Sequence, residues 1–293
     1  MSDTTEISII LPCYNEQENL AQLLQKIRKQ KPDAEIIVVN DGSTDDSARI
    51  ASEQGARVIN HPMKMGNGAT IKTGARHARG EILLFMDSDG QHKPEDIPRL
   101  LKKLEEGFDM VVGARLSSTH ASVGRWMANG FYNWLASVMT GFNIQDLTSG
   151  FRAVRASAFR KFLYLLPNGF SYPTTSTMAF FRAGYPVAYI PIEATARKGK
   201  SKIRLLRDGT RFFVIILKIG ALFSPMRFFL PISVFFFLIG CIYYGYTYIT
   251  TSRFTNMSAL LFITALLIFL IGIVSEQISS LHYRYSEKER IEE

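Results

Sequence analysis

The 293-residue chain is predicted to fold as an α/β domain with a mostly parallel sheet, followed by two membrane-spanning helices. As far as about residue 192, short runs of aliphatic and β-branched residues alternate with stretches of helical periodicity. Residues 228–252 and 254–275 then contain no charged side chain, and only Arg253 separates them. Because a helix rises about 1.5 Å per residue and a bilayer core is roughly 30 Å thick, each run is long enough to span it.

The N-terminal region contains the predicted strands. They are Ile7–Leu11, Glu35–Asn40, Arg57–Asn60, Ile82–Met86, Met110–Ala114 and Val187–Ile192. Runs such as IIVV and ILLF are apolar throughout, which is typical of strands covered on both faces and therefore of a parallel sheet. Between the strands, the spacing of Leu20, Leu23, Leu24 and Ile27 indicates one buried helix face. In such a sheet a ligand binds beyond the carboxyl ends of the strands.

The C-terminal region is predicted to be an interfacial helix followed by a hairpin. The sequence divides into a cytosolic domain at 1–203, an interfacial amphipathic helix at 204–226, and a hairpin with a short tail at 227–293. The spans are expected at about 228–250 and 256–276. A surface helix packed on the domain is the alternative for 204–226. Basic residues on both flanks of the hairpin predict an integral protein of the cytoplasmic membrane, with the domain and both termini in the cytosol.

Charge and cysteine content exclude several classes of protein. The formal net charge is +8, and much of the excess lies between Arg197 and Arg227, beside the first span. That position favours anionic lipid or a phosphorylated substrate as the counterpart, so no nucleic-acid partner is expected. Only two cysteines occur, which excludes a disulfide framework and a cysteine-based zinc site.

Polar motifs stand where four of the predicted strands end. They are LPCYNE, VVNDGSTDD, MDSDGQH and VGAR. Each one alone could be a solvated loop, but together they predict a binding cleft at one edge of the sheet.

The third of these motifs carries a candidate metal site. In an extended chain, residues i and i+2 point to the same side, so Asp87 and Asp89 can approach one cation, and Gln91 follows on that side. Oxygen ligands of this kind suit Mg²⁺ or Mn²⁺. An ordinary turn is the alternative, because DSDG is also favourable turn composition.

These motifs, together with MGNGATIKTG, LTSGFRAVR and KGKSK, resemble glycosyltransferase family 2 in the same order from about Ile7 to Lys202. The resemblance is strongest to the polyprenyl-phosphate glycosyltransferases of the dolichyl-phosphate mannose synthase type. It implies a Rossmann-like GT-A fold and inverting transfer of a hexose from a nucleotide-diphospho-sugar to a polyprenyl (undecaprenyl or dolichyl) phosphate. UDP-hexose is favoured as the donor, and GDP-mannose is the alternative.

The resemblance also implies roles for individual residues. The donor nucleotide sugar would be bound by Pro12, Tyr14, Glu16, Asp41, Gly68, Asp87, Ser88 and Lys202. The metal would be held by Asp87, Asp89 and Gln91, and the acceptor phosphate by Arg125, Ser149, Arg152 and Lys200. Asp89, Arg115 and Arg152 would be catalytic, with Arg115 neutralising the leaving diphosphate. Asp41 also ends a strand before a turn and a helix, a common place for a ribose contact, although helix capping is an alternative.

Two other functions compete with this interpretation. A processive polysaccharide synthase would carry a Q-x-x-R-W motif, whereas the chain has Ser122 in place of that Gln and only two spans. A non-catalytic, membrane-anchored scaffold that binds nucleotide sugars would not need Asp87, Asp89, Arg115 and Arg152 together. The sequence is compatible with a homo-oligomer but does not fix the oligomeric state.

Overall fold

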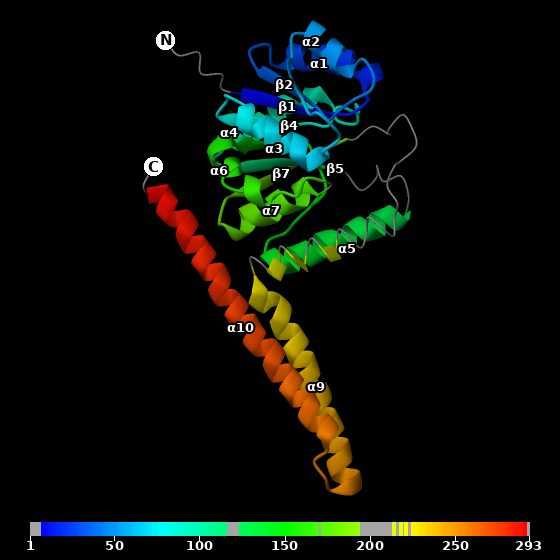
Figure 1. Ribbon diagram of the computed structural model, residues 1–293, viewed down its shortest axis with the longest axis vertical. Coiled ribbons are helices and arrows are strands. Elements are labelled where there is room, and N and C mark those ends of the chain that lie inside the picture. Colours follow the sequence, from blue (N-terminus) through cyan, green and yellow to red (C-terminus); the bar gives the residue numbers. More distant parts are fainter. Residues whose placement is uncertain are drawn as a thin grey trace. The chain divides into compact units, whose positions relative to one another are not determined.

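The structure is a computed structural model that describes residues 7–115, 123–169, 171–193 and 224–291, with short helical pieces between 213 and 221. The side chains of 123–128 and 280–291 are not among the described parts. The chain forms two compact units (Figure 1). The larger unit contains Met1–Trp134 and Asn143–Phe213, and the smaller contains Leu135–Phe142 and Val214–Glu293.

The larger unit is built on a seven-stranded sheet with the order β3-β2-β1-β4-β6-β5-β7. The strands are β1 (Ile7–Cys13), β2 (Glu35–Asn40), β3 (Arg57–Asn60), β4 (Ile82–Phe85), β5 (Met110–Arg115), β6 (Arg152–Arg155) and β7 (Val187–Ile192). All neighbours pair in parallel except β6, which is antiparallel to both β4 and β5. The prediction of a mostly parallel sheet is confirmed, but β6 was not predicted.

Helices cover both faces of this sheet. They are α1 (Gln17–Gln30), α2 (Ser47–Glu53), α3 (Asn67–His77), α4 (Ile97–Glu105), α6 (Ala156–Arg160) and α7 (Tyr172–Arg182), with 3₁₀ turns at Pro94–Asp96 and Leu163–Leu165. A further helix, α5 (Val123–Thr140), follows β5 in the chain and is divided between the two units. The predicted face of α1 is buried in one core with α2, α4 and alternate residues of the strands. Helices α3 and α7 pack against the opposite face, at β1 and β2 and at β7, and α6 packs at β6.

Glycine allows α3 to approach β1 closely. A Cβ at Gly74 would lie 2.4 Å from Cγ2 of Ile10, so any larger residue would push the helix away from the sheet. This close contact fixes the helix whose first residue, Asn67, lies at the edge of the sheet where the candidate site forms.

The smaller unit contains the hairpin of α9 (Pro225–Thr251) and α10 (Asn256–Ile291). Pro225 occupies the first helical turn, where its missing N–H costs nothing. Between the helices, Ser233 Oγ donates to the carbonyl of Ala265 at 2.8 Å, and Gly240 leaves room for the ring of Phe262. Of the helix predicted over 204–226, the structure describes only the helical pieces at 213–214, 217–218 and 220–221 and residues 224–226, and the rest lies outside the described residues.

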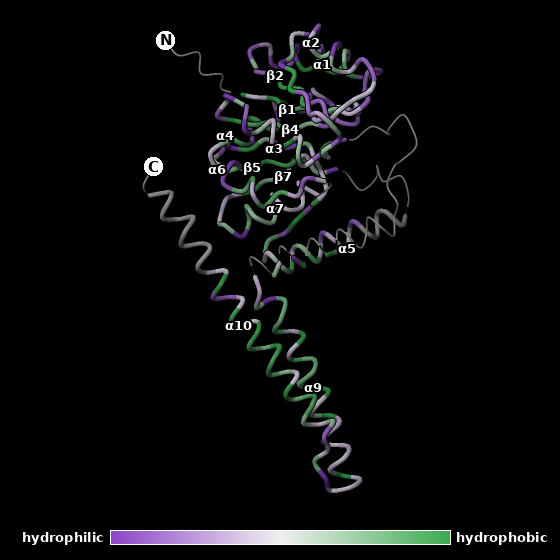
Figure 2. Tube along the Cα trace, in the orientation of Figure 1, coloured by the Kyte–Doolittle hydropathy of each residue, from purple (hydrophilic) through white to green (hydrophobic). Residues whose placement is uncertain are grey.

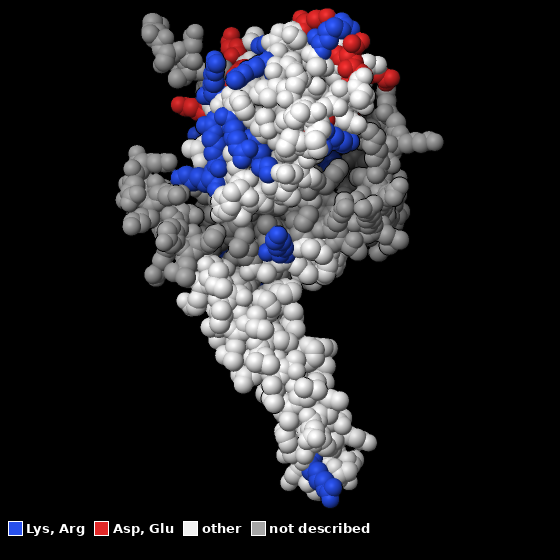
Figure 3. All heavy atoms as spheres, viewed as in Figure 1, with Lys and Arg blue, Asp and Glu red and all other residues white. Residues whose placement is uncertain are grey.

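Both helices of the hairpin have the length and composition of membrane spans. Pro225–Thr251 and Asn256–Ser279 have mean hydropathies of 2.0 and 2.8, and only 11% and 17% of their most apolar windows are buried. A core helix of a soluble protein would be mostly buried, whereas many large apolar side chains of the hairpin are exposed. The residues along the hairpin are mainly hydrophobic (Figure 2), and the face of the hairpin seen in Figure 3 carries very few charged residues. The hairpin is therefore suited to lipid, which supports membrane association.

Candidate active site

The site forms at one edge of the sheet because of the strand directions. Strands β1, β2, β4 and β5 all run the same way, so their carboxyl ends meet at this edge. Strand β6 runs the opposite way and therefore begins here. Its register places Arg152 opposite Phe85, and this brings Gly150 beside Asp87, so close that a Cβ on Gly150 would lie 2.8 Å from Asp87 Oδ2.

Asp87 and Asp89 follow β4 at the point where the chain enters a turn that includes Ser88 and Asp89, so this segment is not the extended chain expected from the sequence. Both are partly exposed, while Ser88 between them is 4% exposed and its hydroxyl donates to the carbonyl of Pro12 at 2.7 Å. Ser88 thus ties the end of β4 to the end of β1, a structural task that differs from the donor contact predicted for it. Asp89 Oδ1 accepts a hydrogen bond from the amide of Gln91 at 3.1 Å.

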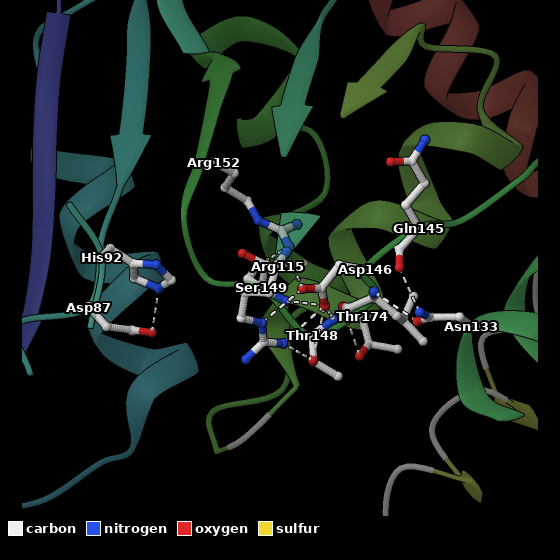
Figure 4. A network of polar contacts seen from close by, with 11 residues as sticks. Asp87, His92, Arg115, Asn133, Gln145, Asp146, Thr148, Ser149, Arg152 and Thr174 are labelled. Carbon is white, nitrogen blue, oxygen red and sulfur yellow. Dashed lines mark hydrogen bonds and ion pairs between the residues drawn. The ribbon is translucent and has the colours of Figure 1, made fainter. Parts of the chain in front are cut away.

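Three side chains act on Asp87. His92 Nε2 lies 3.7 Å from its Oδ2, the side chain of Asn67 donates to it, and the charge of Arg115 is nearby. Burial alone would raise the pKa of Asp87, but these partners outweigh it and the pKa is lowered. The His92 ring points toward the Asp87 carboxylate (Figure 4). His92 is buried and stacks on Phe151, with ring centroids 5.1 Å apart, which limits its movement.

This arrangement fits a divalent cation that takes few ligands from the protein. Among the residues that the structure describes, no three His, Cys, Asp or Glu side chains are grouped to hold a metal ion. Asp87 and Asp89 offer two carboxylates at an open edge, and Mg²⁺ usually takes one or two carboxylates and completes its shell with water and substrate phosphates. Cys13, at the end of β1, does not add a ligand of this kind, because burial raises the pKa of its thiol to about 11.

Arg115, at the end of β5, is held by a residue that the sequence analysis did not single out. Its Nε and Nη2 atoms donate to the two carboxylate oxygens of Asp146 at 2.9 and 3.0 Å, and Nη2 also reaches the hydroxyl of Thr148 (Figure 4). Asp146 accepts further bonds from the amides of Thr148 and Ser149. Although burial opposes both charges, this fork raises the pKa of Arg115 and lowers that of Asp146.

The same turn is attached to α5. Asn133 Nδ2 donates to the carbonyl of Gln145 at 2.7 Å, and Asn133 Oδ1 accepts from the amide of Leu147 at 3.0 Å. The side chain of Asn133 therefore holds the residues on both sides of Asp146 in the sequence, Gln145 and Leu147. The sequence offered no spacing that would have paired Asn133 with this turn.

Arg152 is placed differently from its predicted role. Its side chain is 0% exposed and lies under α7, where it donates to the carbonyl of Pro173 at 3.1 Å and to the hydroxyls of Ser176 and Thr177 at 2.8 and 3.0 Å. It also donates to the carbonyl of Ser149. Because Arg152 opens an inner strand, its side chain enters the core and holds the Ser149 turn from behind. In this structure it is not open to an acceptor phosphate, whereas the buried Ser149 hydroxyl has no partner among the described residues.

The opposite end of the edge carries the residues predicted to bind the nucleotide. Pro12, next to the last residue of β1, is partly exposed, as are Tyr14 and Glu16, which follow the strand. Lys64 Nζ lies 3.5 Å from the centre of the Tyr14 ring. Asp41, at the end of β2, is only 4% exposed. A direct contact of Asp41 with a base or ribose stays a prediction, because the carboxylate is already bonded within the chain.

Asp41 accepts three hydrogen bonds. They come from His61 Nδ1 at 2.9 Å and from the amides of Met65 and Gly66 at 2.8 and 2.9 Å. Burial would raise the pKa of Asp41, but these donors lower it. His61 was not expected to take part in the site.

Gly68 lies against the chain itself. A Cβ here would lie 1.9 Å from the carbonyl oxygen of Pro167, and the Gly68 amide donates to the carbonyl of Gly169 at 2.9 Å. The glycine is needed for this contact of α3 with residues 167–169, and its predicted contact with the donor stays a prediction. Lys200 and Lys202 lie outside the described residues, as does the side chain of Arg125.

The comparison with known families gives a clear result. Residues 8–163, more than half of the chain, match the family described as glycosyl transferase family 2, and residues 224–281 match the GtrB C-terminal hairpin. The chain belongs to glycosyltransferase family 2. The predicted resemblance, the GT-A type of fold and the assignment as a glycosyltransferase are thereby confirmed.

Characterised relatives of this glycosyltransferase cover most of its length. An undecaprenyl-phosphate mannosyltransferase from Micrococcus luteus is 31% identical over 66% of this chain and 86% of that protein. A polyprenol monophosphomannose synthase from Mycolicibacterium smegmatis is 30% identical over 68% of this chain and 82% of that protein. Among solved structures, glucosyl-3-phosphoglycerate synthase from Mycobacterium tuberculosis has a TM-score of 0.62 at 22% identity and covers 74% of this chain and 80% of that one, which shows the shared fold.

Proposed function

We propose that this glycosyltransferase transfers a hexose from a nucleotide-diphospho-sugar to a polyprenyl phosphate at the cytoplasmic face of the membrane, with inversion at the anomeric carbon. The observation that carries the proposal is the pair Asp87 and Asp89 beside the Ser149 turn, in a chain that ends in a lipid-suited hairpin. The acceptors named for the two mannosyl-transferring relatives support a polyprenyl phosphate.

The acidic pair would act on the donor. Asp87 and Asp89 would hold Mg²⁺ or Mn²⁺, which when bound supplies positive charge to the leaving diphosphate. The backbone amide of Gln91 donates to Asp89 Oδ1, so the two residues lie close together. Gln91 would be the third ligand of the metal. The lowered pKa of Asp87 keeps this carboxylate ionised at neutral pH.

The basic residues would act on the phosphates. Arg115, already oriented by Asp146, presents its guanidinium at the edge beside Asp87 and would stabilise the departing diphosphate. A lipid monophosphate has a second pKa near 6, so it is largely dianionic at neutral pH and needs no strong general base. Rate enhancement would then come from alignment of the two anions and from electrostatic stabilisation.

The acceptor would be recognised by the turn that follows Asp146. The buried hydroxyl of Ser149 has no partner among the described residues, and it belongs to the residue next to Gly150, which lies close to Asp87. It would therefore be near the anomeric carbon during transfer of the sugar. Arg152 would act through this turn. Arg125, Lys200 and Lys202 remain proposed contacts to the two phosphate groups.

The hairpin gives the reaction its location. A polyprenyl chain cannot leave the bilayer, so its phosphate stays at the level of the headgroups, and an enzyme held by two spans works at that level. We propose that the donor enters from the cytosol and that the domain and both termini lie on that side.

Two donors remain candidates. UDP-hexose is the donor we propose, and GDP-mannose is the second, favoured by the two relatives named for mannose transfer. A panel of radiolabelled UDP- and GDP-sugars, offered with undecaprenyl phosphate to the detergent-purified chain with and without EDTA, distinguishes them. Label in the prenyl lipid that disappears with EDTA and returns with Mn²⁺ supports the proposal. No labelled lipid from any donor would overturn it.

A further inference from the structure

The segment between β3 and α3 contacts both ends of the proposed donor site. We call residues 62–67 the donor loop. At one end Lys64 places its ammonium over the ring of Tyr14, and at the other the side chain of Asn67 donates to Asp87. A nucleotide sugar that lies between Tyr14 and Asp87 would run along this loop. The position of the loop would therefore affect the contacts of both the nucleotide and the sugar.

The donor loop has few supports of its own. Residues 62–65 are exposed, with Met63 67% and Met65 44% exposed. Its backbone lies against Gly42, where a Cβ would be 2.9 Å from the carbonyl carbon of Met63. The amides of Met65 and Gly66 both donate to the carboxylate of Asp41. Asp41 is therefore the main polar anchor of the loop that the structure describes.

His61 fixes that anchor. The register of β2 and β3 pairs Asn40 with Asn60, so the next residues, Asp41 and His61, lie side by side, and the amide of His61 continues the ladder to the carbonyl of Asn40 at 2.9 Å. The ring of His61 is 7% exposed, with Nδ1 2.9 Å from Asp41 Oδ1 and Nε2 2.9 Å from the hydroxyl of Thr73 on α3. A neutral ring that donates from Nδ1 and accepts at Nε2 satisfies both partners.

We infer that His61 is a positioning residue of the donor site. It holds the Asp41 carboxylate between β3 and α3, and Asp41 holds the donor loop so that Lys64 and Asn67 face the bound nucleotide sugar. This inference rests on the proposed function in one respect, the identity of the ligand that lies along the loop. The connection from His61 to the loop is a property of the chain itself.

Four variants test the inference. His61→Ala removes both hydrogen bonds, while His61→Asn keeps an amide donor near the place of Nδ1. Thr73→Val removes only the outer hydroxyl partner. Asn60→Ala is the matched control, because it removes the neighbouring hydrogen bond from Asn40 Nδ2, at 2.9 Å, and leaves the hydrogen bonds of His61 and Asp41 in place.

The kinetic readout separates positioning from general destabilisation. His61→Ala should raise the KM for the donor about tenfold, equivalent to about 1.4 kcal/mol, and leave the KM for polyprenyl phosphate within about twofold. His61→Asn should recover most of the donor affinity, and Asn60→Ala should resemble the parent protein. Equal changes in both KM values, or no change in either, would overturn the inference.

A second readout does not depend on activity. Amide hydrogen exchange on the full chain in detergent should show the peptide covering Met65 and Gly66 exchanging about tenfold faster in His61→Ala, and unchanged in Asn60→Ala. If His61→Ala does not fold, Thr73→Val should show a smaller increase in the same peptide. Unaltered exchange overturns the inference even if sugar transfer is observed. A parent protein that transfers no sugar, but whose loop loosens in the variants, would overturn the proposed function and leave the His61 connection standing.

Discussion

The acidic residues at the edge of the sheet are kept ionised by donors that the fold brings to them. Burial would raise the pKa values of Asp41, Asp87 and Asp146, yet hydrogen bonds and nearby cations lower all three. Their partners come from distant parts of the sequence, such as Arg115 for Asp146 and His61 for Asp41. Each carboxylate therefore relies on partners that the fold supplies to offset the cost of burying its charge.

The metal assignment predicts a clear effect of one substitution. Asp89→Asn removes a negative charge from the pair that would hold the cation, and we expect sugar transfer to fall at least about a hundredfold. The side chain is at an open edge, so the folded, membrane-bound state should persist. Turnover, the thermal unfolding temperature and the membrane-bound fraction measure this. Asp33→Asn, at an exposed position on another loop, is the control, and near-normal turnover in Asp89→Asn would contradict the assignment.

The pair of Arg115 and Asp146 predicts a pH dependence of stability. A carboxyl group whose pKa is lowered by folding contributes stability that is complete above its unfolded pKa, about 3.9 for Asp, and that is lost as the pH falls through the folded value. Asp146→Asn should cost about 3 kcal/mol at neutral pH, because it leaves a largely buried guanidinium without its partner.

The difference between parent and Asp146→Asn should shrink as the pH drops below about 4. Thermal unfolding of both proteins between neutral and acidic pH, with Asp33→Asn as the surface control, gives the comparison. A difference in unfolding temperature that stays constant over this range would show that the charge of Asp146 does not contribute.

Among the elements, β6 shows why part of the site could not be predicted. Its four residues, Arg152–Arg155, begin and end in arginine, so neither an apolar run nor a clean alternation marks a strand. Yet its antiparallel pairing brings the Ser149 turn to Asp87 and sends Arg152 inward. The sequence therefore located the right motif, but the direction of Arg152 depended on a strand without a recognisable pattern.

Other parts of the site could be predicted in varying degree. Runs of aliphatic and β-branched residues placed β2, β3 and β7 at their observed bounds. The motif with Asp87 and Asp89 was correctly placed just after β4, but Ser88 and Asp89 form a turn, so a shared side for the two carboxylates stays a prediction. Strand order would also have revealed His61, because β2 and β3 are successive parallel strands whose ends lie side by side. The pairing of Asp146 with Arg115 joins a turn to the last residue of β5, 31 residues away in the sequence, and no periodicity encodes it.

The close approach of Gly150, just before β6, to Asp87, just after β4, predicts the effect of adding a methyl group at position 150. Gly150→Ala would place Cβ 2.8 Å from Asp87 Oδ2, so the carboxylate or the Ser149 turn must shift. We expect the concentration of Mn²⁺ needed for half-maximal transfer to rise about tenfold, because the geometry of the acidic pair changes. Gly169→Ala is the matched control, since a Cβ there meets nothing within 4 Å. An unchanged metal requirement in Gly150→Ala would show that Asp87 is not a ligand.

At the scale of the whole molecule, each of the two compact units is formed by two separate segments of the chain. The last turns of α5 belong to the smaller unit, where Arg227, near the start of α9, donates from Nη1 to the carbonyl of Val138 at 3.3 Å. A cation there also suits the negative end of α5. The chain therefore enters the hairpin unit twice, at 135–142 and again from residue 214, which couples the insertion between β5 and β6 to the spans.

The distribution of basic residues predicts the orientation of the hairpin. Arg227 begins the first span and several basic residues follow the second, whereas the turn between them carries only Arg253, so the turn should lie on the far side of the membrane from the larger unit. In a Cys241→Ser background, Arg253→Cys should react with a membrane-impermeant maleimide in intact cells. Asp33→Cys, exposed on the larger unit, should react only after permeabilisation. Cys13 is buried and serves as the silent background. Labelling of position 33 and not 253 in intact cells would place the domain outside, where it could not meet cytosolic nucleotide sugars.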